Sequence, residues 1–398
     1  MDPFERLPSE LVQQIIACTG DFTGVESILL ASPQVNAVFQ AQPARILKDL
    51  ILSNSITCMP EIERLCYNIG LLNNPSLYCK DLDDYHQTCE GTPALGYTKS
   101  LYVIQIGAQI QRLACTCLSF MQQNLISTMN NIPAGSLFDG PPLNIQIASN
   151  TFSWTEEYRV YWALWHLQHY SHLRKAATNR WGWEDLSIQC LDAYNTWNDI
   201  EYHAAEKLWT VAAVLSDMGL GVNWLADHPE AEEPSQTVWP GSKETAIPFF
   251  PLLDLPPAST PIHHGSLILW TPPALPPETE ATHVWSLTPQ RRSRRQVHVD
   301  MFHRKGTRLT RNCSPASYTL TKIKPWRRFG WAIWDSWRMY AAGLSGRIRY
   351  RRPIPTPDGS MLKGEPQNLK DREPAVDYVA RWFAMVGEER PFHCRAIR

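Results

Sequence analysis

The hydrophobic positions at the start of the chain repeat with a helical period. Five large apolar residues of the stretch LPSELVQQII spread over about half of a helical wheel, wider than the roughly 100° stripe with which a surface helix faces its core. These residues are Leu7, Leu11, Val12, Ile15 and Ile16. So short a helix cannot cover so wide a face against one small neighbour. The pattern therefore predicts that the rest of the chain, or a second protein, covers part of it.

Residues 1–53 divide into four short helices. Each has its own start signal, and Gly20 ends the first. The start signals are Pro8, the capping-box pair Thr23 and Glu26, the cap Ser32 with Pro33, and Pro43. In the fourth helix, apolar residues share the face that we expect to point inward: Ile46, Leu47, Leu50 and Ile51.

The rest of the chain has mostly helical periodicity, broken by one proline-rich stretch. We expect two long helices, at 102–121 and 155–177, with a loop between them at 131–150. Shorter helices are predicted at 186–196, 201–215, 331–342 and 374–386. Thirteen of the 31 prolines lie between Pro229 and Pro289, which disfavours helix there. The predicted fold class is mainly α, with an all-α body and a proline-rich excursion.

This pattern divides the chain into four parts: a small helical unit at 1–53, a helical body at 54–228, a proline-rich segment at 229–290, and a basic segment with C-terminal helices at 291–398. We expect the last part to pack on the same body. No apolar run approaches the roughly 20 residues that span a bilayer, and the start lacks the pattern of a secretion signal. We expect a protein of the cytoplasm or nucleus, with reduced cysteines.

Charge is distributed unevenly. Residues 1–290 hold 13 basic and 30 acidic side chains, whereas 291–352 hold 17 basic and two acidic ones. The densest run contains Arg291, Arg292, Arg294 and Arg295. Three interpretations remain open: a solvated loop that lies on the acidic body, a nuclear import signal, or a contact to nucleic-acid phosphates.

The order Leu7-Pro8-x-Glu10-Leu11-x-x-x-Ile15-Ile16 resembles the start of the F-box. The similarity continues through Val25-x-x-Ile28-Leu29 and Ser32-x-x-Val35-x-x-x-Phe39. This resemblance implies a helical hairpin that docks the Skp-type adaptor of a cullin-type E3 ubiquitin ligase. By position, it places eight residues at the adaptor contacts or in the core beneath them: Leu7, Pro8, Leu11, Ile15, Ile28, Leu29, Val35 and Phe39.

The body carries a second, looser resemblance. The pattern Glu157-x-Arg159-x-x-x-Ala163-Leu164-Trp165 and the pattern Gly330-Trp331-x-x-Trp334-Asp335-x-x-Arg338 are similar to stretches in F-box-like proteins of filamentous fungi. In that group the part after the F-box is the presumed substrate-binding region. The resemblance therefore implies a non-catalytic adaptor that links an unknown protein substrate, through the Skp subunit, to a cullin scaffold.

The candidates for other chemistry are weak. His166, His169 and His172 have a helical spacing that turns the third about 120° away from the first, so one metal ion cannot easily bind all three. Cys115 and Cys117 point apart on a helix. We find no catalytic or nucleotide-binding motif and expect no cofactor, metal or catalytic residue. The tryptophans at 331, 334 and 337 are typical of a core. The alternative function is a nucleic-acid-binding or nuclear interaction protein that acts through residues 291–352.

Overall fold

The computed structural model describes residues 2–91, 94–131, 143–188, 190–191, 202–218, 327–334, 338–339, 342, 344, 354–355 and 361–362. The helices are α1 (Ser9–Thr19), α2 (Phe22–Ala31), α3 (Pro33–Ala41), α4 (Pro43–Ser53), α5 (Pro60–Leu72), α6 (Leu82–Thr88), α7 (Tyr97–Asn130), α8 (Ile145–Ala148), α9 (Trp154–Ala176) with its π-helical continuation η1 (Ala177–Trp181), and α11 (Tyr202–Asp217). Two short strands, β1 (Ile354–Pro355) and β2 (Met361–Leu362), pair antiparallel, with Ile354 opposite Leu362. The prediction of a mainly α fold is confirmed. None of the helices in the described ranges combines the length and apolarity needed to cross a bilayer.

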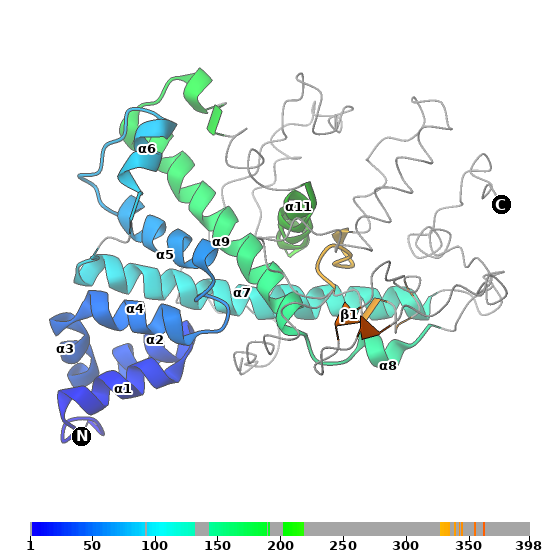
Figure 1. Cartoon of the computed structure of the whole chain (residues 1–398), viewed down its shortest axis with the longest axis horizontal. Coiled ribbons are helices and arrows are strands. Elements are labelled where there is room, and N and C mark those ends of the chain that lie inside the picture. The colour runs from blue at the N-terminus through cyan, green and yellow to red at the C-terminus, as the bar shows by residue number, and fades with distance from the viewer. Residues whose placement is uncertain are drawn as a thin grey trace.

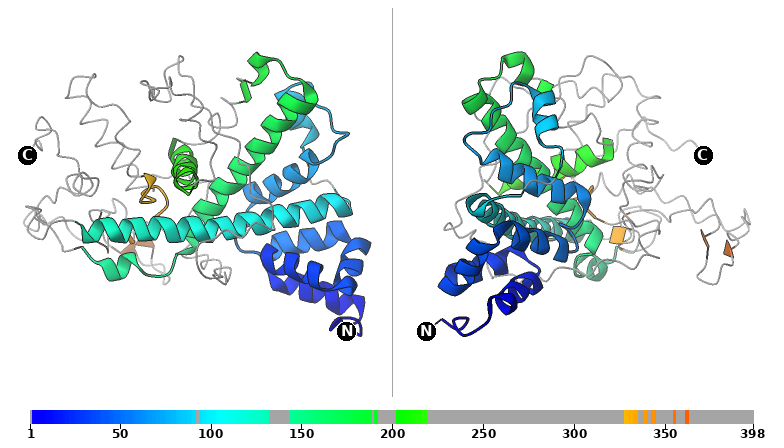
Figure 2. Two further views of the ribbon diagram at one scale, coloured as in Figure 1. Left: turned by 180° about the vertical axis from the view of Figure 1, so that it is seen from behind. Right: turned by 60° about the vertical axis from the view of Figure 1, so that its left-hand side comes forward.

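Helix α7 is the axis of the described structure (Figure 1). Helices α2 and α4 of the N-terminal layer, residues 2–53, pack on it, and so do α5 and α9. Helix α9 crosses α7 obliquely, and α5 and α11 pack against α9. Seen from behind, α1–α4 lie at one end of α7, and α8 lies near the other (Figure 2).

The helices of the N-terminal layer begin and end at the predicted signals, with one correction. Helix α1 begins directly after Pro8 and ends at Gly20, and Ser32 Oγ accepts a hydrogen bond from the Val35 backbone N–H (3.0 Å). The predicted capping box of Thr23 and Glu26 is wrong. Helix α2 is capped by the Asp21 carboxylate, which accepts from the Gly24 N–H (2.6 Å). As predicted for the fourth helix, all four apolar residues of its inner face are buried: Ile46, Leu47, Leu50 and Ile51.

The N-terminal layer shares one hydrophobic core with the body. Phe22 of α2 lies against Gly107 of α7 so closely that a Cβ atom at position 107 would lie 2.5 Å from the phenyl ring, and its ring centroid is 6.1 Å from that of Trp165 on α9. Glu26 forms an ion pair with Arg112 of α7. The layer is therefore seated directly on the two long helices.

Helix α7 extends beyond both of its predicted ends, whereas α9 agrees with its prediction within one residue at each end. Helix α7 runs to Asn130 because Met121, Leu125 and Met129 continue the buried stripe at intervals of four residues past a polar stretch. Helix α9 begins at Trp154 with a complete capping box: Ser153 Oγ accepts from the Glu156 N–H, and the Glu156 carboxylate accepts from the Ser153 N–H (2.9 Å). After Ala176 the chain continues as η1, which ends at Gly182.

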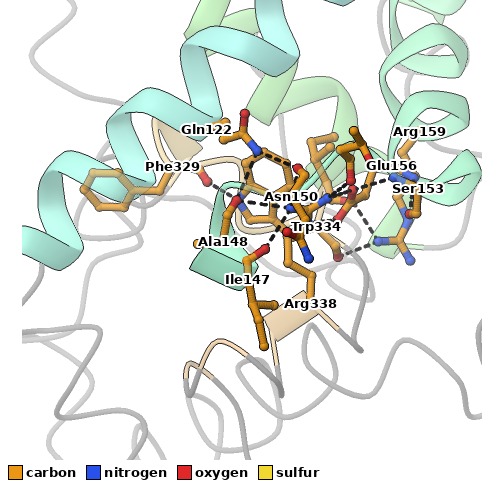
Figure 3. Close-up of polar contacts among 12 residues, drawn as sticks. Gln122, Ile147, Ala148, Asn150, Ser153, Glu156, Arg159, Phe329, Trp334 and Arg338 are labelled. Atoms are coloured by element: carbon orange, nitrogen blue, oxygen red, sulfur yellow. Dashed lines mark hydrogen bonds and ion pairs between the residues drawn. The ribbon is translucent and has the colours of Figure 1, made fainter. Parts of the chain in front are cut away.

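A buried ion pair joins residues that are far apart in the sequence (Figure 3). Arg338 binds the Glu156 carboxylate through two bonds, from Nε to Oε1 (2.7 Å) and from Nη2 to Oε2 (2.8 Å), and both side chains are buried. The guanidinium also donates to four backbone carbonyl oxygens, those of Ile147 (3.2 Å), Ala148 (3.1 Å), Asn150 (3.0 Å) and Thr151 (2.6 Å). One side chain thus fixes the loop around α8 and the start of α9.

Of the helix predicted at 331–342, the described residues form turns at 331–333, a bend at Trp334 and helix at Arg338 and Met339, where the Ala342 N–H donates to the Arg338 carbonyl oxygen. Arg159 of α9 donates from Nη1 to the carbonyl oxygens of Ile333 (2.8 Å) and Trp334 (2.7 Å). Gly330 has a φ of 68° and lies against Met121, so a larger residue would be strained there and would collide with Met121. Trp331 and Trp334 are buried, as predicted for core tryptophans. The residues 335–337 and the predicted helix at 374–386 lie outside the described residues.

Candidate functional site

The eight residues that the F-box resemblance placed at the adaptor surface fall into two groups. Leu29, Val35 and Phe39 are buried in the core, so they support the surface and are closed to a partner. The others reach solvent to different degrees. Leu7 and Ile28 are partly buried, whereas Pro8, Leu11 and Ile15 are exposed.

Helix α1 has two apolar faces with opposite environments. Val12 and Ile16 are fully buried and pack into the core. Leu11 and Ile15 precede them by one residue each and are 45% and 37% exposed. Because residues four apart lie one above the other on a helix, Leu11 and Ile15 form one continuous strip. The part of the apolar stripe on α1 that was predicted to lack a covering neighbour is therefore exposed to solvent in the isolated chain.

Two further apolar side chains of the N-terminal layer reach solvent, and sequence reasoning missed both. Leu30 of α2 is 80% exposed and Leu52 of α4 is 46% exposed. Each directly follows a buried residue, Leu29 and Ile51, at a position that helical periodicity turns away from the core. The sequence signal that could have revealed these two exposed side chains is a leucine at a helical position that faces away from the core. Of the six exposed large apolar residues of the described chain, the N-terminal layer therefore holds four.

The histidines of α9 have structural partners. His169 Nε2 and Tyr85 OH lie 2.7 Å apart, and His172 Nε2 and Tyr102 OH lie 2.6 Å apart. Burial lowers the pKa of His166 and of His169 from 6.5 to about 3, and it lowers the pKa of His172 as well. These imidazoles are neutral at physiological pH. Within the described ranges, no group of three or more His, Cys, Asp or Glu residues is placed to hold a metal ion.

Burial holds several thiols and phenols of the body protonated. Burial raises the pKa of Cys66 well above its usual value and that of Cys115 to about 12. Burial likewise raises the pKa of Tyr67 to about 12. A thiol is a nucleophile only as a thiolate, so burial makes these cysteines poor nucleophiles. All cysteines of the described residues are free thiols.

The basic region predicted as an anion or import site is only partly described. Arg291, Arg292, Arg294 and Arg295 lie outside the described residues. Of the same region, Arg328 pairs with Asp217 of α11 through Nε and Oδ2 (2.9 Å), and Arg338 pairs with Glu156 as above. These two arginines are thus engaged with acidic groups of the body itself.

Comparison with known proteins adds no relative. No family model, no curated protein and no solved structure matches the chain.

Proposed function

We propose that this protein is a non-catalytic adaptor whose N-terminal layer docks the Skp subunit of a cullin-type E3 ubiquitin ligase. The observation that carries the proposal is the open strip formed by Leu11 and Ile15 on α1, beside the buried Val12 and Ile16. Its neighbour Pro8 is also exposed at the start of the helix. The strip lies within the motif Leu7-Pro8-x-Glu10-Leu11-x-x-x-Ile15-Ile16, which resembles the F-box.

The physical argument is that exposed aliphatic side chains on a rigid helix bind a partner at low entropic cost. Full burial of a leucine or isoleucine side chain contributes about 1.5–3 kcal/mol. Leu11 and Ile15 are already partly covered, so each contributes about half of that. The layer is seated on α7 and α9 through Phe22, and docking therefore requires no ordering of α1.

The alternative partner, nucleic acid, has less support among the described residues. Arg328 and Arg338 belong to the basic region 291–352, and both form ion pairs with the chain's own carboxylates. A guanidinium that is held by an internal carboxylate releases few counterions on binding a phosphate backbone.

The test is co-purification of the full chain with a Skp-type adaptor. We expect the wild-type chain to retain the adaptor and the double variant Leu11→Asp plus Ile15→Asp to lose it, because two carboxylates on the strip would be desolvated in the interface. Both positions are exposed, so the variant keeps the unfolding midpoint of the wild type within a few degrees.

The matched control is Gln13→Asp, which places one carboxylate on a partly exposed position of the same helix, about 200° around the helix from Leu11 and therefore away from the strip. It should retain the adaptor. Failure of the wild-type chain to bind any Skp-type adaptor, or equal binding by the double variant and the wild type, would contradict the proposal.

A further inference from the structure

A second exposed apolar surface lies far from the N-terminal layer. Tyr78 is 65% exposed and Leu186 is 70% exposed, and these are the two exposed large apolar residues of the described chain that lie outside residues 2–53. Two mostly buried tryptophans, Trp181 and Trp183, join the loop that carries Tyr78 to the stretch that carries Leu186. We call these four residues the distal patch.

Hydrogen bonds from the tryptophans make the distal patch rigid. Trp181 Nε1 donates to the carbonyl oxygen of Leu77, and Trp183 Nε1 donates to that of Cys79, both at 2.7 Å. The backbone is thereby fixed on either side of Tyr78. The two indole rings also contact each other, with centroids 5.5 Å apart. A partner that covers Tyr78 therefore does not have to order the loop that carries it.

Arg180 adds a second tie to the same loop. Its Nη1 donates to the carbonyl oxygens of Leu72 (3.0 Å) and Asn74 (2.9 Å), and its guanidinium lies 5.2 Å from the ring of Trp181. The π-helical turn η1 places Arg180 and Trp181 together over the loop that follows α5. Unusual π turns are frequent at functional sites.

The stretches of chain that carry the distal patch are rich in acidic residues. The two stretches that form it, 77–91 and 180–188, carry two basic side chains and six acidic ones. The basic residues are Lys80 and Arg180, and Arg180 is engaged as described above. The acidic residues are Asp81, Asp83, Asp84, Glu90, Glu184 and Asp185. These six residues, which we call the acidic rim, lie on the same stretches as Tyr78 and Leu186, so the distal patch complements a segment that combines basic with large apolar residues.

The distal patch and the N-terminal layer lie on different sides of helix α7. In every view, α6 and the C-terminal end of α9 lie on the opposite side of α7 from α1 (Figures 1 and 2). A partner on one side therefore leaves the other side free, which is what an adaptor between two proteins needs.

We propose that the distal patch is the docking site for a basic, leucine-containing segment of the protein that this adaptor presents. The inference rests on the proposed adaptor function and names the class of partner. Tyr78 and Leu186 supply the apolar contacts, and the acidic rim selects basic residues that flank the partner's apolar anchors. Tyrosine is among the residues that most often dominate interface energies.

Fluorescence anisotropy of the full chain with a short fluorescein-labelled peptide, in which arginines alternate with leucines, tests the proposal. We expect binding that weakens as salt is raised, and no binding of the twin peptide in which glutamates replace the arginines. Tyr78→Ser and Leu186→Ser should each weaken binding about tenfold. The matched control Leu30→Ser removes an equally exposed leucine from the N-terminal layer and should bind as the wild type does.

Three results would overturn the proposal: no binding of the basic peptide, equal binding of both peptides, or equal weakening by Leu30→Ser and Leu186→Ser. Binding only after Arg291, Arg292, Arg294 and Arg295 are changed to glutamine would show that the chain's own basic segment occupies the patch, which also overturns it. Skp co-purification of the wild-type chain, beside the Leu186→Ser variant, separates the two proposals. Failure of the wild-type chain to retain Skp while it still binds the peptide refutes the adaptor function and leaves the peptide site standing, whereas Skp retention by Leu186→Ser with weakened peptide binding supports both.

Discussion

Replacement of Arg338 by methionine tests how the 327–344 segment is held on the helical body. Methionine keeps an unbranched apolar side chain at the site and removes the guanidinium. The change leaves the carboxylate of Glu156 fully buried, with the Ser153 N–H as a remaining donor, and it removes one donor from each of four backbone carbonyl oxygens.

The expected loss is large because removal of the Arg338 guanidinium leaves the charge of Glu156 buried without its partner. Removal of one partner of a buried ion pair costs about 3–5 kcal/mol, since the other charge stays desolvated. The carbonyl oxygens add less, because those of Ala148 and Asn150 still accept a hydrogen bond from Gln122 Nε2. We therefore expect Arg338→Met to lower the free energy of unfolding by about 4 kcal/mol.

Denaturation in urea, followed by tryptophan fluorescence, measures this loss. Trp334 lies 5.4 Å from the Arg338 guanidinium and reports on the site. The matched control is Arg328→Met, which removes a half-exposed arginine from its pair with Asp217 and should cost less than about 1 kcal/mol. The double variant Glu156→Gln plus Arg338→Met should be less destabilised than the sum of its single variants by about 1.5 kcal/mol or more, because no charge is then left buried.

Either of two results would refute this reasoning. The first is an Arg338→Met variant as stable as Arg328→Met, which would mean that solvent reaches Glu156 in the native chain. The second is additivity of the two single changes, which would mean that Glu156 and Arg338 do not interact.

Three further predictions concern the core. Because burial lowers the pKa of His166 and His169 from 6.5 to about 3, the unfolded chain binds more protons over that interval. The free energy of unfolding should therefore fall as the pH drops below about 6.5, by up to about 1.4 kcal/mol per pH unit for each histidine, and unfolding curves of His169→Gln should show a shallower fall. Gly107→Ala places a Cβ atom 2.5 Å from the Phe22 ring and should cost about 1–3 kcal/mol in thermal unfolding; an unchanged midpoint would show that the layer can shift on α7. Ser32→Ala removes the cap of α3 and should cost about 1 kcal/mol in the same assay, whereas Ser27→Ala, at an exposed and non-capping position, should be nearly neutral.

Local signals predicted the N-terminal layer well. Proline and serine at helix starts and glycine at a helix end act within one turn, so they can be recognised without the fold. Thr23 was misassigned because Asp21, two residues earlier, offers a stronger cap in the same region, and Glu26 is drawn away to Arg112. The exposure of Leu11 and Ile15 also agrees with the prediction that the stripe on α1 is too wide for its own neighbours.

The contacts of the 327–344 segment could not be predicted from local pattern. Arg338 and Glu156 are separated by 182 residues, and helical periodicity carries no information about such a pair. The segment has the apolar spacing of a helix, yet Arg159 binds the carbonyl oxygens of Ile333 and Trp334 that a helix would have used internally. The distal patch could not be predicted for the same reason, because the tryptophans of 181–183 and the loop at 77–79 meet only in the folded chain.

The hydrophobic core that the N-terminal layer shares with the body fixes the distance between the two docking surfaces of the proposed adaptor. Phe22 of the N-terminal layer contacts Trp165 in the middle of α9, and Trp181 of the distal patch stands on the continuation of the same helix. Sixteen residues of helix separate these two tryptophans, which corresponds to roughly 24 Å at 1.5 Å per residue. A layer joined to the body by a flexible linker would leave the distance between the partners free. Here Gly107, Phe22 and Trp165 clamp the layer to the two long helices, so a protein bound at the distal patch would be held at a fixed distance and orientation from one bound at α1.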